Sequence, residues 1–180
     1  GVGKYNEFDQ LRIAGIRHAD LKGFSFSRED VDARSLANQY AQILGQVFTH
    51  EMKPMEVEIL VAEVGHDPSG DQLFHILYDG TLIDETGWAV LGGEADAIGE
   101  RMGAAWTEGA TRAQAVAAAI NSLAGPDRTI PVEELEVAVL TRSGARRTFE
   151  RIEDDALAAL LAADGPQHRR RAPRRHCIPG

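Results

Sequence analysis

The stretch GVGKYNEF at residues 1–8 comes closest to a phosphate-binding pattern. A nucleotide-binding loop reads Gly-x-x-x-x-Gly-Lys-Ser/Thr, in which backbone N–H groups hold the phosphates and the last hydroxyl binds Mg²⁺. In this sequence Tyr5 follows Lys4, so the Ser or Thr that would hold the metal ion is missing. The first glycine of the pattern would also precede Gly1. We therefore reject a phosphate-binding loop.

The other reactive side chains lack the spacing of a metal site or a catalytic site. The histidines form neither an H-x-H nor an H-E-x-x-H pair, there is a single cysteine, and no Gly-x-Ser-x-Gly motif is present. An N-terminal nucleophile needs Thr, Ser or Cys whose own amine acts as the base, and Gly1 has no side chain. We therefore expect no catalytic residue, no metal and no cofactor. The histidines are expected to be solvated or singly hydrogen-bonded: His18, His50, His66, His75, His168 and His176.

The charge distribution narrows the choice of partners. The net charge is −9, but residues 166–180 carry five Arg and no acidic residue, which leaves −14 for residues 1–165. A body this acidic argues against nucleic acid as a partner. No segment approaches the roughly 20 apolar residues of a membrane span. The lone Cys177 fits a reducing cytoplasm. We expect a cytoplasmic domain without a membrane partner, followed by a disordered Arg-rich tail over residues 164–180.

The first elements that the sequence predicts are two helices. Apolar spacing predicts a helix over residues 5–21 that ends at Gly23. Ser27 is the predicted N-cap of a second helix, which ends near Glu51 because Pro54 follows. The predicted buried stripes are Phe8, Leu11, Ile16 and Ala19 in the first helix, and Leu36, Tyr40, Leu44 and Val47 or Phe48 in the second. Tyr40 is accordingly interpreted as a core residue rather than an interface anchor.

Strands follow in the middle of the chain. The strand predicted over residues 55–64 is apolar on both faces at its centre, so something should cover each face of its sheet. Segments 73–78 and 81–84 predict a hairpin across Asp79 and Gly80. Segment 87–93 is predicted to be another strand. Its final Gly92 and Gly93 indicate a tight turn into a helix rather than a dinucleotide-binding loop.

The last third returns to helices around one pair of strands. A helix is expected at 94–107, and the next is marked by a capping box of Thr111 and Gln114 and a stop at Gly125. Strands at 135–140 and 147–152 precede a helix at 153–162, whose predicted buried residues are Leu157, Leu160 and Leu161. Runs of strands and runs of helices predict an α+β fold with an antiparallel sheet. Sheets covered on both faces predict stacked layers in the order helices, sheet, sheet, helices.

Several long stretches resemble the α subunits of the 20S proteasome core, in their actinobacterial form. They occur in the order and at the spacing of that family across about residues 1–163: GKYNEFDQLRIAGIRHAD, DVDARSLANQYAQILGQVFT, KPMEVEILVAEVG, YDGTLIDE and LEVAVL. The resemblance implies a proteasome α-type domain over 1–163 with the four-layer α-β-β-α sandwich of N-terminal-nucleophile hydrolases. Family members carry a gate, a helix and the first strands before the position of Gly1. The chain is therefore expected to be N-terminally truncated, to leave a sheet edge unpaired and not to form stable rings alone.

The resemblance also implies function, partners and a site. Seven identical α subunits form an outer ring that is not catalytic, gates substrate entry and contacts the β subunits that carry the active sites. The ring docks the C-terminal tails of a regulatory ring ATPase, which delivers proteins tagged with a prokaryotic ubiquitin-like protein. Gly3 and Lys4 match positions of the activator-docking pocket, where N–H groups and a cation suit a carboxylate. The alternative is a glycine required by the backbone and a solvated lysine.

Other interpretations stay open. Trp88 and Trp106 are assigned to the core or to ring contacts rather than to a ligand platform. A free-standing N-terminal-nucleophile hydrolase is the alternative function, and it would expose Thr, Ser or Cys at the start of the mature chain. A small-molecule or nucleotide-binding module is the third function class, and thermal shift with nucleotides would test it.

Overall fold

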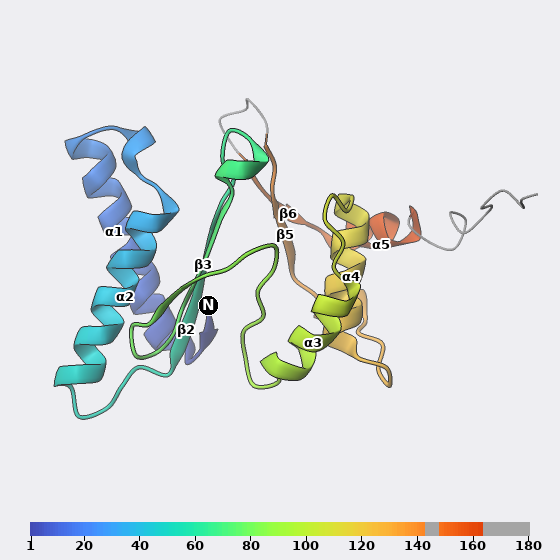
Figure 1. The fold of residues 1–180 in the computed structure, drawn as a ribbon, viewed down its shortest axis with the longest axis horizontal. Coiled ribbons are helices and arrows are strands. Elements are labelled where there is room, and N and C mark those ends of the chain that lie inside the picture. The colour runs from blue at the N-terminus through green and yellow to red at the C-terminus, as the bar shows by residue number, and fades with distance from the viewer. Residues whose placement is uncertain (143–147, 164–180) are drawn as a thin grey trace, which may run out of the picture.

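The computed structural model describes residues 1–142 and 148–163, so the predicted Arg-rich tail lies outside the described residues (Figure 1). The helices within these ranges are α1 (Tyr5–Ser25), α2 (Ala33–His50), α3 (Ala95–Ala105), α4 (Arg112–Ala124) and α5 (Asp154–Ala163). The strands are β1 (Val2–Gly3), β2 (Val57–Glu63), β3 (Gln72–Ile76), β4 (Leu82–Asp84), β5 (Val137–Leu140) and β6 (Phe149–Ile152). Short 3-10 turns are η1 (Arg28–Asp30), η2 (Pro68–Gly70) and η3 (Val132–Glu134).

Four strands form an antiparallel sheet in the order β1-β2-β3-β4. Helix α2 packs on β2 and β3, and α1 packs on α2, so both helices lie on one side of the sheet (Figure 1). Tyr40 is 8% exposed within this core, which confirms its predicted core position. The buried core residues are Leu11, Ala33, Ala37, Tyr40, Leu44, Val57, Ile59, Val61, Phe74 and Ile76.

The tight turn predicted at Asp79 and Gly80 forms between β3 and β4, and it lies close to α2. The N–H of Leu77 donates to the carbonyl of Thr81 at 2.9 Å, and the N–H of Gly80 donates to the carbonyl of Leu77 at 3.0 Å. Gly80 has a φ of +87°. A Cβ at this position would lie 2.5 Å from the carbonyl oxygen of Ala41, so the turn and α2 approach too closely for a side chain.

The second part of the chain builds a separate two-stranded sheet, β5-β6, which pairs antiparallel from Val137 and Ile152 to Leu140 and Phe149. Helix α3 packs on α4, and α4 packs on α5. Figure 1 shows these three helices on the opposite side of the strands from α1 and α2. Antiparallel sheets with segregated helices confirm the predicted α+β class. Four stacked layers stay a prediction.

The expectation that both faces of the strand at 55–64 are covered is wrong for the described residues. Burial along β2 alternates: Val57, Ile59 and Val61 are buried against α2, whereas Leu60 is 37% exposed and Ala62 is also exposed. An apolar run at the centre of a strand normally indicates burial on both faces. Here the first helix pair covers one face, and no second layer among the described residues buries Leu60.

The limits of the first two helices also differ from the prediction. Helix α1 continues past Gly23 to Ser25, because the N–H of Phe26 still donates to the carbonyl of Lys22 at 3.0 Å. Ser27 does not cap α2. The N-cap is Asp32, whose carboxylate accepts the N–H of Ser35 at 2.5 Å. A tertiary contact reinforces this start, since Glu63 on β2 accepts the N–H of Ala33 at 2.6 Å.

The buried face of α1 is shifted from the predicted stripe. Leu11 is buried as expected, but Ile16 is 49% exposed and Gly15 is buried instead. The Tyr40 hydroxyl occupies the space that a Cβ on Gly15 would need. The approach of α2, rather than hydrophobicity, therefore decides which face of α1 is inside.

The predicted strand at 87–93 does not form. No regular structure is assigned between Asp84 and Ala95, because no strand of the described chain pairs with this segment. The predicted turn at its end is present, with Gly92 at a φ of +113° and its carbonyl accepting the N–H of Ala95 at 3.2 Å. Trp88 in this segment packs on α3: a Cβ on Gly103 would lie 3.2 Å from its ring.

Local signals predict the C-terminal helices well. Thr111 and Gln114 form the expected capping box, with the Gln114 N–H donating to Thr111 at 3.3 Å and the Thr111 N–H donating to Gln114 at 3.0 Å. Gly125 ends α4 with a φ of +70°. On α5, Leu157 is buried and Leu160 and Leu161 are half-buried. Each of these signals lies within a few residues of the feature it specifies.

Candidate functional site

The Gly-Lys corner joins the first strand directly to the first helix. Val2 pairs with Glu58 and Gly3 with Val57 across the β1-β2 ladder. Lys4 is the N-cap residue of α1, and its carbonyl accepts the N–H groups of Glu7 at 3.1 Å and Phe8 at 3.0 Å. The strand thus turns into the helix within one residue, at Lys4, rather than through a wide phosphate-binding loop.

Gly3 has a backbone role in this corner. Its φ is +118°, a region that L side chains rarely adopt. A Cβ at Gly3 would also collide with the carbonyl oxygen of Glu56. The chain therefore needs glycine here to bring β1 and the start of α1 against β2, whatever else the corner binds.

The Lys4 side chain is ion-paired rather than solvated alone. Its Nζ lies 2.6 Å from Glu56, whose pKa is lowered chiefly by this hydrogen bond, and the pKa of Lys4 is raised by the same bond. Lys53 lies 3.5 Å from the other carboxylate oxygen of Glu56 and 3.9 Å from Glu7. Glu7 in turn accepts the N–H of Glu56 at 2.7 Å. We call these four residues, Lys4, Glu7, Lys53 and Glu56, the corner network.

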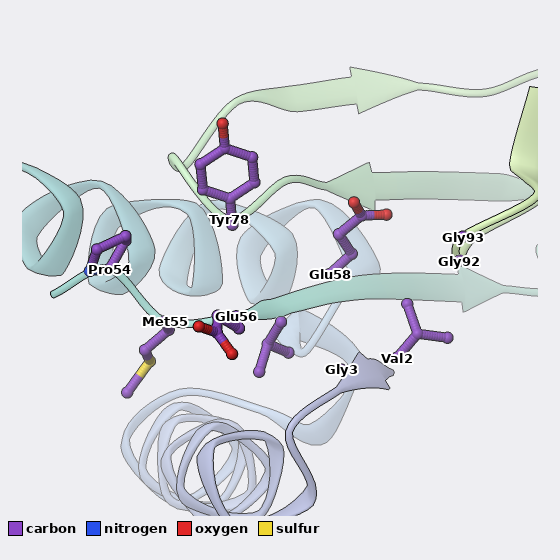
Figure 2. Close-up of a pocket in the computed structure, with 10 residues that line it drawn as sticks. Val2, Gly3, Pro54, Met55, Glu56, Glu58, Tyr78, Gly92 and Gly93 are labelled. Carbon is purple, nitrogen blue, oxygen red and sulfur yellow. The ribbon is translucent and has the colours of Figure 1, made fainter.

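A cleft of about 530 Å³ opens beside the corner (Figure 2). Gly3 lines it, whereas Lys4 does not, although the carboxylate partner of Lys4 does. Figure 2 shows Val2 toward the turn at Gly92 and Gly93, with Pro54 and Met55 at the opposite end. The lining is Val2, Gly3, Pro54, Met55, Glu56, Val57, Glu58, Tyr78, Gly92 and Gly93. Its charged side chains are both carboxylates, and the neighbouring cations Lys4 and Lys53 reach it only through their ion pairs with Glu56.

One histidine, His75, has the single hydrogen bond that the sequence analysis allows, but it lies between two carboxylates. Nε2 of His75 donates to Glu58 at 3.1 Å, and its Nδ1 lies 3.7 Å from Glu85. The β2-β3 register places Leu60 opposite His75, which makes Glu58 a diagonal neighbour. The sequence offered no signal for this cluster, because cross-strand register joins residues 17 positions apart. His18 has the expected single partner, Ser35.

Residues 1–142 and 148–163 offer neither a metal-binding cluster nor a membrane-spanning helix. No cluster of three or more His, Cys, Asp or Glu suits a metal ion there. No helix in those ranges is both long and apolar enough to cross a membrane.

Trp106 is 36% exposed at the end of α3, and its indole faces Gly87.

Comparison with known proteins gives consistent matches. The chain is 59% identical to a proteasome subunit alpha of Acidimicrobium ferrooxidans over 167 residues, which cover 93% of this chain and 72% of that protein. It is 50% identical to a proteasome subunit alpha of Sanguibacter keddieii, covering 92% of this chain and 68% of that protein. A proteasome subunit alpha of Kineococcus radiotolerans is 49% identical over 91% of this chain and 73% of its own length. No family model matches the chain.

Proposed function

Because this chain belongs to the family of proteasome α subunits, we propose that it is a non-catalytic subunit of the outer ring of the 20S proteasome core. The observation that carries the proposal is 59% identity over 93% of the chain to a protein of that name. In this proposal residues 1–163 are the α-type domain, and seven copies form the ring. The ring rests on β subunits that hold the catalytic threonines, and it controls substrate entry in the cytoplasm.

The finer part of the proposal concerns the outer surface of the ring. Gly3 and Lys4 belong to a pocket that receives the C-terminal carboxylate of a regulatory ring ATPase, which delivers proteins tagged with a prokaryotic ubiquitin-like protein. Two features of the corner support this role. Lys4 supplies a half-exposed cation, and it stands at the N-terminus of the 21-residue helix α1, where free N–H groups favour negative charge.

The test uses core particles assembled from the host's β subunits and full-length α subunits, either wild-type or Lys4→Ala. We expect Lys4→Ala to leave hydrolysis of a short fluorogenic peptide unchanged, because the β subunits perform it. ATPase-dependent degradation of a tagged protein should fall about tenfold, since a charge-assisted hydrogen bond is lost. Lys22→Ala is the matched control, because Lys22 lies at the far end of α1, where it pairs with Asp32 at 3.5 Å.

The outcomes separate the two parts of the proposal. If full-length α subunits that contain this chain fail to associate with β subunits in native mass spectrometry, the ring-subunit proposal is wrong. If particles assemble but Lys4→Ala binds the ATPase as tightly as wild type, the docking pocket must be placed elsewhere.

A further inference from the structure

Lys4, the proposed docking cation, is already paired with a carboxylate of its own chain. Glu56 reaches Lys4 in two ways: its side chain lies 2.6 Å from Nζ, and its carbonyl accepts the backbone N–H of Lys4 at 3.0 Å. The β1-β2 pairing of Gly3 with Val57 holds the two residues at this distance. A carboxylate that approaches Lys4 therefore meets an ion pair rather than a free ammonium group.

The corner network also offers Glu56 a second cation. One carboxylate oxygen of Glu56 faces Lys4, and the other lies 3.5 Å from Lys53. Glu7 holds the backbone of Glu56 through its N–H and lies 3.9 Å from Lys53. The network thus contains two cations and two carboxylates and carries no net charge. An added carboxylate at Lys4 would compete with Glu56 for the same ammonium group, and Glu56 has a second cation, Lys53, toward which it can withdraw.

We propose that Glu56 is an autoinhibitory competitor, which occupies Lys4 until the C-terminal carboxylate of the partner displaces it. This inference rests on the proposed docking function of Gly3 and Lys4. Glu56 is suited to the role because it lines the cleft beside Gly3, where it would meet a docking peptide directly (Figure 2).

The exposure of the pair makes displacement inexpensive. The side chains of Lys4 and Glu56 are 46% and 53% exposed, and ion pairs this exposed are weak because water solvates both groups. A buried pair would hold its partners far more firmly, since separating it would strand a charge out of water. Glu56 therefore weakens the docking of a carboxylate without blocking it.

The experiment measures peptide binding to assembled core particles by fluorescence anisotropy. The probe is a labelled peptide of the last ten residues of the host's ring ATPase, prepared as the free acid and as the C-terminal amide. We expect Glu56→Gln to bind the free acid about two- to fivefold more tightly than wild type, the range that an exposed ion pair allows. Binding of the amide should not change.

Glu58→Gln is the matched control. Glu58 lines the same cleft and carries the same charge, but its carboxylate bonds His75 rather than Lys4. Because salt screens exposed charges, its removal should change free-acid affinity by less than about twofold. If Glu58→Gln and Glu56→Gln increased the affinity for the free-acid peptide equally, the effect would come from the overall charge of the cleft. That result would overturn the role of Glu56 as a competitor.

Two further outcomes are distinct. Wild-type particles could prefer the free-acid peptide, lose that preference when Lys4 is replaced, and yet bind the peptide as tightly as Glu56→Gln particles. In that case Glu56 is not a competitor, and the docking proposal stands. If neither wild type nor Glu56→Gln distinguishes free acid from amide, the docking proposal fails and the competitor fails with it.

Discussion

Residues 1–84 and residues 88–163 bury their apolar side chains to very different extents. The first region holds the ten-residue core between α1, α2, β2 and β3. In the second region, Met102 and Leu157 are the buried apolar side chains among the described residues. The helices of the second region are rich in Ala and Gly, which offer little surface to bury.

Polar contacts and helix caps therefore contribute a larger share of the stability in the second region than in the first. Arg101 on α3 donates to the carbonyl of Ser122 at 2.8 Å, near the end of α4. The buried Ser122 hydroxyl donates to the carbonyl of Ala118 at 2.7 Å and lies 3.6 Å from the sulfur of Met102. These bonds orient the helices, but each contributes only about 1 kcal/mol, whereas a large buried side chain contributes several times more. We infer that the first region is the more stable of the two.

Arg142 links the two regions through side-chain hydrogen bonds. Arg142, which follows β5, donates to both carboxylate oxygens of Asp71 at 2.9 and 2.7 Å and to the carbonyl of Gly65. Asp71 also accepts the N–H of Gly65 at 2.9 Å. The turn at 65–71 is thus fixed to the second sheet by a surface contact rather than by a shared core.

The largest expected effect comes from Phe74→Ala in the first core. Phe74 is 0% exposed and lies under Arg34, whose guanidinium carbon is 4.7 Å from the ring centroid. Its loss should cost about 3–5 kcal/mol of unfolding free energy, measured by urea denaturation of the purified chain. In native-state hydrogen exchange, amides of α2, β2 and β3 should lose protection, while those of α4 change little.

Phe149→Ala is the control for this prediction. Phe149 is 58% exposed on β6, so the substitution should change stability by less than about 0.5 kcal/mol. Equal loss of protection in α2 and α4 on replacing Phe74 would show that both regions unfold as one unit, contrary to the comparison.

A smaller, local effect is expected from Thr111→Ala in the second region. The substitution removes the Thr111 hydroxyl, which accepts the backbone N–H of Gln114 in the capping box, so this N–H loses its acceptor. We expect a loss of about 1 kcal/mol confined to α4, read from hydrogen exchange of its amides. Thr107→Ala is the control, because Thr107 is exposed and lies outside the cap. Loss of protection across β2 and β3 as well would contradict the separation of the two regions.

The smallest effect on stability is expected from Asp71→Asn, which removes the charge that pairs with Arg142 between the two regions. Arg142 lowers the pKa of Asp71, so the unfolded chain binds this proton more readily than the folded one. The stabilisation is present above the unfolded pKa of about 3.9 and is lost as pH falls through the lower folded-state pKa. Because the pair is largely exposed, Asp71→Asn should cost less than about 1 kcal/mol at pH 7.

The measurement for Asp71→Asn is its unfolding free energy beside wild type from pH 7 to pH 2.5. The difference should shrink below about pH 4, as the wild-type carboxylate becomes protonated. A difference that stays constant across this range would mean that the Arg142 tie does not act through the charge of Asp71.

Parts of the fold follow from the sequence because their causes are local. The capping box at Thr111, the turn at Gly80 and the apolar spacing of α2 each depend on residues within a few positions. The strand expected at 87–93 failed because a strand needs a neighbour that local pattern does not supply. Gly3 and Lys4 were predicted as docking residues through family resemblance, whereas the carboxylate of Glu56 beside Lys4 was not predicted.

The sequence by itself determined the α+β class and most helix and strand positions, because periodicity, caps and turn residues act over short distances. The family followed from the resemblance of several long stretches to proteasome α subunits. Tertiary structure alone decided which faces are buried and which charges meet. Glu63 fixes where α2 begins, Tyr40 selects the inner face of α1, and β1-β2 pairing sets Glu56 against Lys4. In each case residues 25 or more positions apart come together, and register and helix packing, rather than composition, determine that meeting.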